Sequence, residues 1–167
     1  MDLEWGAWEL REITAVGVFA RAVVDSTEVL RISAPRPAAG IVDARMVRHR
    51  MDAHLDDRHV YVLGSLNWRI HYVPAGESTE VGAFTSRETY RVRVPLVFDE
   101  FMRPVRGADP EVALVSSEAT LRRMFLCSDE GGRIGLVTRI HAGVEVSGPV
   151  RMHVAVLGPD ENRGDEW

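Results

Sequence analysis

Hydrophobic and polar side chains alternate along much of the chain beyond residue 41, with the period of two that is typical of half-buried strands. The clearest run spans residues 60–72, and its opposite face is mostly polar. The apolar face of that run consists of Val60, Val62, Gly64, Leu66, Trp68, Ile70 and Tyr72. Similar runs begin at Tyr90 and at Ile134. The dipeptide Gly148-Pro149 predicts a break in the last run, which resumes from Val150 to Val156.

Turn-forming residues separate these predicted strands. The segment 74–78 predicts a turn, and the segment 128–132, Ser-Asp-Glu-Gly-Gly, predicts a hairpin connection. Residues 12–33 are rich in Val, Ile, Phe and Ala, which suit a strand or a helix. A turn-like triplet, Asp25-Ser26-Thr27, favours two strands within that segment.

Helix is expected only in short pieces, at residues 99–103 and 111–118. Eight or so strands at short spacing therefore predict an all-β fold. Two architectures fit the pattern: an antiparallel β-sandwich, or two packed subdomains rich in β-hairpins.

The expected domain organisation has three parts. Residues 1–11 form an acidic, Trp-containing arm, and residues 12–157 form the β-rich domain. A strand, an acidic turn and a longer strand are expected in the same order twice along this domain. This weak internal repeat suggests two possible halves, 12–98 and 111–157. Residues 158–167 form an acidic tail that cannot contribute a core element, and we expect it to be flexible.

The charge and the composition of the chain argue against several classes of protein. The 20 basic residues, all arginine, and 25 acidic residues give a net charge of −5. The acidic excess lies at the two ends, so the chain lacks the basic stripe of a nucleic-acid-binding protein. No apolar run approaches the roughly 18 residues of a membrane span. With Cys127 alone, an intrachain disulfide is excluded.

No sequence pattern supports an enzyme. The common nucleophile, zinc-protease, phosphate-loop and dinucleotide motifs are missing. His49, His54 and His59 are five residues apart and leave a metal site as an alternative, but a polar strand end explains them more simply. We read Cys127 as a small hydrophobic residue. The expectation is no catalytic residue, no metal, no cofactor and no small-molecule substrate.

Tryptophan residues near the two ends of the chain suggest sites of contact with another protein chain. Trp5, Trp8 and Leu10 precede the first predicted strand, and Trp167 ends the acidic tail. Tryptophan is enriched at interfaces. The arm can fold back on its own domain or dock onto a neighbouring copy, and the tail can serve a partner or only solubility.

Several segments resemble the outer spore-coat morphogenetic protein E family. The opening Arg11–Val16 is similar to that family's Arg-Glu-Ile-led entry into an apolar strand, and Gly40–Asp43 is similar to its next strand entry. The strand Val60–Tyr72, with Trp68-Arg69-Ile70-His71-Tyr72, and the layout of Glu111–Val156 extend the resemblance. The broader SPOCS-type domains of sporulation and cell-envelope proteins share this strand–turn–strand pattern.

The resemblance implies a non-enzymatic structural and morphogenetic protein of the bacterial endospore coat. Such a protein is made in the mother-cell cytoplasm and is deposited on the forespore surface. There it self-assembles and recruits other coat proteins. The alternative is a monomeric β-sandwich module that binds a cell-envelope glycan or a protein partner, with Tyr61, Asn67 and Arg69 as the candidate face.

Overall fold

The computed structural model describes residues 8–56, 59–76, 79–127 and 131–157. In these residues the chain forms eight strands and no helix. The strands are β1 (Trp8–Ile32), β2 (Ala38–Asp56), β3 (His59–Pro74), β4 (Gly82–Val94), β5 (Val97–Phe98), β6 (Arg103–Pro104), β7 (Glu111–Cys127) and β8 (Arg133–Leu157).

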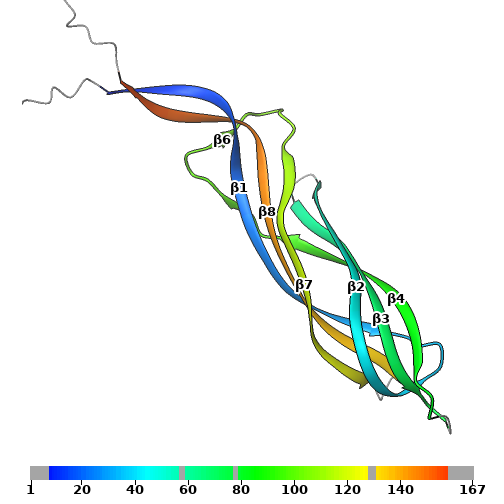
Figure 1. The fold of residues 1–167 in the computed structure, drawn as a ribbon. Coiled ribbons are helices and arrows are strands. Elements are labelled where there is room, and N and C mark those ends of the chain that lie inside the picture. Colours follow the sequence, from blue (N-terminus) through cyan, green and yellow to red (C-terminus); the bar gives the residue numbers. More distant parts are fainter. Residues whose placement is uncertain (1–7, 57–58, 77–78, 128–130, 158–167) are drawn as a thin grey trace, which may run out of the picture.

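The strands form two antiparallel sheets that pack face to face (Figure 1). The first sheet has the order β5-β1-β8-β6, and β7 also pairs with β8. The second sheet has the order β2-β3-β4. Across the interface β7 lies against β2, and β1 lies against β4. The prediction of an all-β, sandwich-type fold is confirmed.

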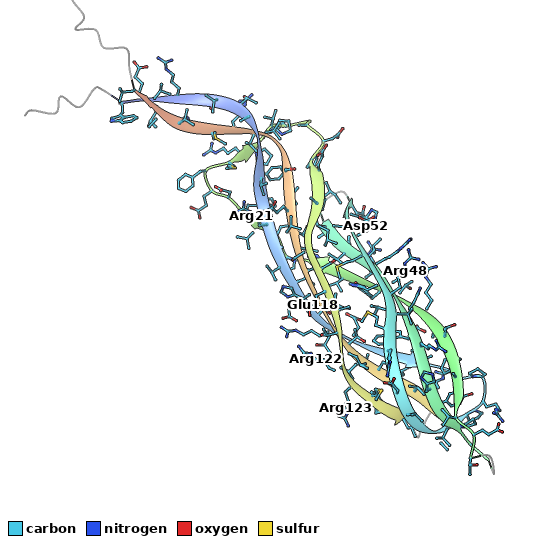
Figure 2. The ribbon with its side chains drawn as sticks, in the orientation of Figure 1. Arg21, Arg48, Asp52, Glu118, Arg122 and Arg123 are labelled. Carbon is cyan, nitrogen blue, oxygen red and sulfur yellow. The ribbon has the colours of Figure 1, made fainter. Side chains whose placement is uncertain are left out.

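The core lies between the two sheets and is built from the alternating faces that the sequence predicts. The buried row of β3 comprises Val60, Val62, Leu66, Trp68, Ile70 and Tyr72. The facing row of β8 comprises Ile134, Leu136, Thr138, Ile140, Ala142, Val144 and Val146. Because side chains alternate across a strand, the intervening residues face outward. Figure 2 shows charged side chains on these outer faces, including Glu118 and Arg122 on β7 and Arg48 on β2.

The prediction of two strands within residues 12–33 is wrong, because β1 runs without a break through Asp25-Ser26-Thr27. These residues pair with His141, Ile140 and Arg139 of β8, so the ladder supplies the hydrogen bonds that a turn would otherwise make. Arg139 Nε also donates to Asp25 Oδ1 at 2.7 Å. This contact with Arg139 holds the pKa of the Asp25 carboxyl below its usual value. Long-range pairing thus overrides local turn propensity.

The predicted break at Gly148-Pro149 is also wrong, since β8 continues to Leu157. Pro149 lies opposite Val16 of β1, and its carbonyl accepts a hydrogen bond from the amide of Val105. In a strand, the nitrogen and the carbonyl of one residue point to the same side. The missing N–H of Pro149 therefore points away from β1 and leaves the β1/β8 ladder intact.

The two predicted helical pieces are not helices. Residues 111–118 belong to strand β7. Residues 99–103 contain a tight turn, in which the Asp99 carboxylate accepts from the Phe101 amide at 2.8 Å. The connection containing this turn joins β5, paired with β1, to β6, paired with β8. For residues 111–118, pairing with β8 along the sheet decided the outcome.

The possible halves 12–98 and 111–157 do not correspond to the two sheets. β1, from the first half, pairs with β8, from the second half, over almost its entire length. β2, β3 and β4 form the other sheet by themselves. The strands that flank the predicted hairpin at 128–132, β7 and β8, are antiparallel neighbours with Cys127 opposite Arg133, while residues 128–130 lie outside the described residues.

Candidate assembly surface

A two-stranded ribbon extends from one end of the sandwich (Figure 1). It consists of residues 8–18 of β1 paired with residues 147–157 of β8, from Trp8 opposite Leu157 to Val18 opposite Ser147. We call this segment the β1/β8 ribbon. Among the described residues, two other strands join it, both near its base: β6 at Val150 and Arg151, and β7 through Glu111, which lies opposite Ser147. Both outer edges of the ribbon therefore have unpaired backbone groups along most of their length.

Apolar side chains project from both faces of the ribbon. One face continues the inner face of the sandwich and carries Ile13, Met152, Val154 and Val156. The other face carries Trp8, Leu10, Val16 and Leu157. Near its base, the inner face is covered by Met102, which lies close to Gly17 and Val150. Further out, Figure 2 shows side chains on both sides with no other strand beside them.

The predicted docking residues fall partly on this ribbon. Trp8 is 59% exposed and Leu10 is 76% exposed. Both lie inside β1, because the strand begins at Trp8 and residues 8–11 are not an arm that precedes it. Trp5 and Trp167 lie outside the described residues.

Sequence reasoning missed two members of the same surface. Val16 is 80% exposed and Leu157 is 57% exposed on the face that carries Leu10. The apolar alternation from Val150 to Val156 marked a strand there, but Leu157 lies outside that row and Val16 lies in a distant segment of the chain. The pairing of β1 with the end of β8 is non-local, so the sequence pattern alone did not bring these residues together.

Two edge strands of the sandwich body, β1 and β4, carry charged residues that disfavour pairing with another chain. Glu28 of β1 and Glu88 of β4 lie on the inward faces of their strands and are partly buried. Each accepts a hydrogen bond of 2.7 Å, from Ser26 and from Ser86 respectively. Inward-pointing charges on edge strands oppose pairing with another chain, because addition of a strand would bury them further. Edge pairing is thus disfavoured at β1 and β4 of the body.

The histidines of the metal alternative do not converge. His49 points between the sheets, and its Nε2 lies 2.9 Å from the Tyr90 hydroxyl. Burial lowers the pKa of His49, which favours the neutral ring. His54 lies 3.2 Å from Asp52 on the exposed part of β2, and His59 contacts Tyr61. In the described part of the chain, no group of three His, Cys, Asp or Glu residues is placed to hold a metal ion.

The face considered for glycan binding is partly occupied. The Arg91 guanidinium lies 3.8 Å from the centroid of the Tyr61 ring, so a cation already covers one side of that ring. Asn67 Oδ1 is buried and has no described hydrogen-bond partner. Arg69 remains exposed on the same face.

The comparisons with known proteins leave the family open: no family model, no curated protein and no solved structure matches this chain. In the described residues, the chain also has no helix that could span a membrane.

Proposed function

We propose that this chain is a non-enzymatic structural protein that assembles with copies of itself through the β1/β8 ribbon. The observation that carries the proposal is a two-stranded ribbon that has exposed apolar side chains on both faces and, in the described residues, unpaired backbone groups along most of both edges. An isolated two-stranded ribbon is at best marginally stable in water. A neighbouring copy that pairs with the ribbon edge and covers its faces supplies the missing stabilisation.

A second copy fits this surface for two reasons. Every copy presents the same open edge, so an edge-to-edge pair is available without any other partner. The acids Glu28 and Glu88 make the body edges at β1 and β4 poor competitors for that pairing. Contact between ribbons also leaves the rest of the sandwich surface free to bind other proteins.

We further propose that the assembly belongs to the endospore coat and recruits other coat proteins. The support for this setting is the sequence resemblance carried by Arg11–Val16, Val60–Tyr72 and Glu111–Val156. Such a protein is made in the mother-cell cytoplasm and is deposited on the forespore. In a spore-forming host, a fluorescent fusion is expected to form a ring around the forespore. Diffuse fluorescence throughout the mother cell contradicts the coat setting.

The assembly proposal is tested by placing charges on the ribbon. The double variant Leu10→Lys/Val16→Lys puts two ammonium groups on its exposed apolar face. Full burial of a Leu or Val side chain contributes about 1.5–3 kcal/mol, so self-association is expected to weaken at least about a hundredfold. Light scattering is expected to show a shift from a multimer towards the 18.6 kDa monomer.

The matched control is Val23→Lys/Val29→Lys. Both residues are exposed on the same strand, but they lie in the sandwich body. This variant has the same change in charge and is expected to keep the wild-type mass. Equal masses for the wild type and the ribbon variant would reject the ribbon as the assembly surface. A wild type that is itself monomeric would favour the alternative of a monomeric binding module.

A further inference from the structure

A hollow of about 440 Å³ lies at the base of the β1/β8 ribbon, where β6 joins β8. Its lining includes Arg103, Arg106, Arg151, His153, Glu12 and Phe101. We call this feature the arginine hollow. Three separate segments supply these residues: the start of β1, the connection containing β6, and the end of β8.

Positive charge exceeds negative charge in the arginine hollow. Three guanidinium groups face one carboxylate, Glu12, and that carboxylate lies 3.8 Å from Arg151. Within the described residues, Arg103 and Arg106 have no ion pair or side-chain hydrogen bond. The formal charge of the hollow is therefore about +2 when His153 is neutral.

The strand register makes this arrangement energetically unfavourable in the absence of an anion. Arg103 lies directly opposite Arg151 in the antiparallel β6/β8 pair. Like charges at such positions are destabilising, because their side chains project to the same face about 5 Å apart. An oxyanion between the two guanidinium groups converts this repulsion into two attractive contacts.

Backbone hydrogen bonds fix the position of the segment that carries Arg103. The amide of Asp99 donates to the carbonyl of Phe19 at 2.8 Å, and the amide of Val105 donates to the carbonyl of Pro149 at 2.9 Å. These bonds fasten both ends of the connection that carries Arg103 to the β1/β8 ladder. Because the backbone that carries Arg103 is already fixed, binding has to order only the arginine side chains, which favours affinity.

We propose that the arginine hollow binds a phosphate-type dianion, either as the free anion or as the phosphate group of an organic phosphomonoester. The planar guanidinium fork matches the geometry of phosphate oxygens. Phe101, 83% exposed at the rim, offers an apolar surface for the organic part of an ester. Glu12 and Arg151 lie on the ribbon face that also carries Leu10 and Val16, so the arginine hollow is part of that face.

The test is calorimetric titration of the full chain with sodium phosphate at constant ionic strength. Saturable binding is expected, and Arg103→Ala/Arg151→Ala is expected to weaken it at least about tenfold, since both charge-assisted hydrogen bonds are lost. The control is Arg48→Ala, which removes a positive charge from an exposed position on β2. This control is expected to bind phosphate as the wild type does.

A second variant separates a lost site from a damaged fold. Glu12→Gln removes the competing carboxylate and is expected to bind phosphate about two- to fivefold more tightly, which misfolding cannot produce. Absence of saturable binding by the wild type overturns the proposal. So does unchanged affinity in the Arg103→Ala/Arg151→Ala variant.

Titration with phenyl phosphate distinguishes the two sources of the anion. If the site takes an ester, phenyl phosphate binds more tightly than inorganic phosphate, and Phe101→Ala removes that advantage. Equal affinity for the two probes supports the oxyanion site and assigns it to the free anion.

Discussion

Gly64→Ala is expected to lower the free energy of unfolding by about 3–5 kcal/mol, the range for loss of a core aromatic side chain. A Cβ atom at Gly64 would lie 2.0 Å from Cζ of Tyr90 and 2.2 Å from its hydroxyl oxygen. Real Cβ atoms do not approach ring atoms so closely. The substitution therefore forces the Tyr90 ring out of its position between the sheets.

The ring of Tyr90 depends on this position for several contacts. Tyr90 lies directly opposite Gly64 in the β3/β4 ladder, and its ring crosses β3 over the glycine. Its hydroxyl reaches Nε2 of His49 on β2, so one side chain links all three strands of the sheet. Burial, and to a lesser extent the charge of Glu28, raises the pKa of Tyr90 to about 12. Displacement of the ring abolishes this network.

Denaturant unfolding monitored by circular dichroism measures the effect. Gly40→Ala is the matched control, because a Cβ there meets only Val73 at 3.7 Å, an ordinary contact. That control is expected to change stability by less than about 1 kcal/mol. In a Tyr90→Ala background, Gly64→Ala is expected to cost little more, since the clash is gone. Equal unfolding midpoints for Gly64→Ala and Gly40→Ala would contradict this packing.

Trp68→Ala is expected to be equally damaging, at about 3–5 kcal/mol. Trp68 is the largest of the fully buried side chains and lies in the middle strand of its sheet, between Met46 of β2 and Ser86 of β4. A domain of this size is stable by only about 5–15 kcal/mol. The cavity left by the indole therefore removes a large share of the total stability.

Two substitutions on the same strand set the scale for Trp68→Ala. Arg69→Ala changes an exposed neighbour and is expected to stay within about 0.5 kcal/mol of the wild type. Trp68→Phe keeps most of the apolar volume and removes an indole N–H that has no described acceptor, so it is expected to cost much less than alanine. Thermal unfolding measures the stability of the three variants. A Trp68→Ala protein as stable as the Arg69→Ala protein would refute the assigned core.

The sequence predicted the fold best where one strand face is buried without interruption. The rows beginning at Val60 and at Ile134 alternate strictly, and both are core rows in the structure. Prediction failed where local chemistry and long-range pairing disagree. The turn-forming triplet at Asp25 and the dipeptide Gly148-Pro149 both lie within strands, because β1 and β8 pair along almost their entire length.

The candidate surface was predictable only in part. Trp8 and Leu10 stood out as apolar residues near an acidic end of the chain, and both are exposed on the ribbon. Val16 and Leu157 did not stand out, because their role depends on which strand pairs with β1. The arginine hollow was equally hidden, since Glu12 approaches Arg151 through the β1/β8 pairing and Arg103 approaches it through the β6/β8 pairing.

The central claim is that copies of the chain pair through the open edge of the β1/β8 ribbon. Amide hydrogen exchange at low and high protein concentration tests it most directly, because an amide paired across an interface is protected only when the interface forms. We expect protection that grows with concentration at residues 8–18 and 147–157, and unchanged exchange at the edge strand β4. Exchange at residues 8–18 that is independent of concentration would contradict the account.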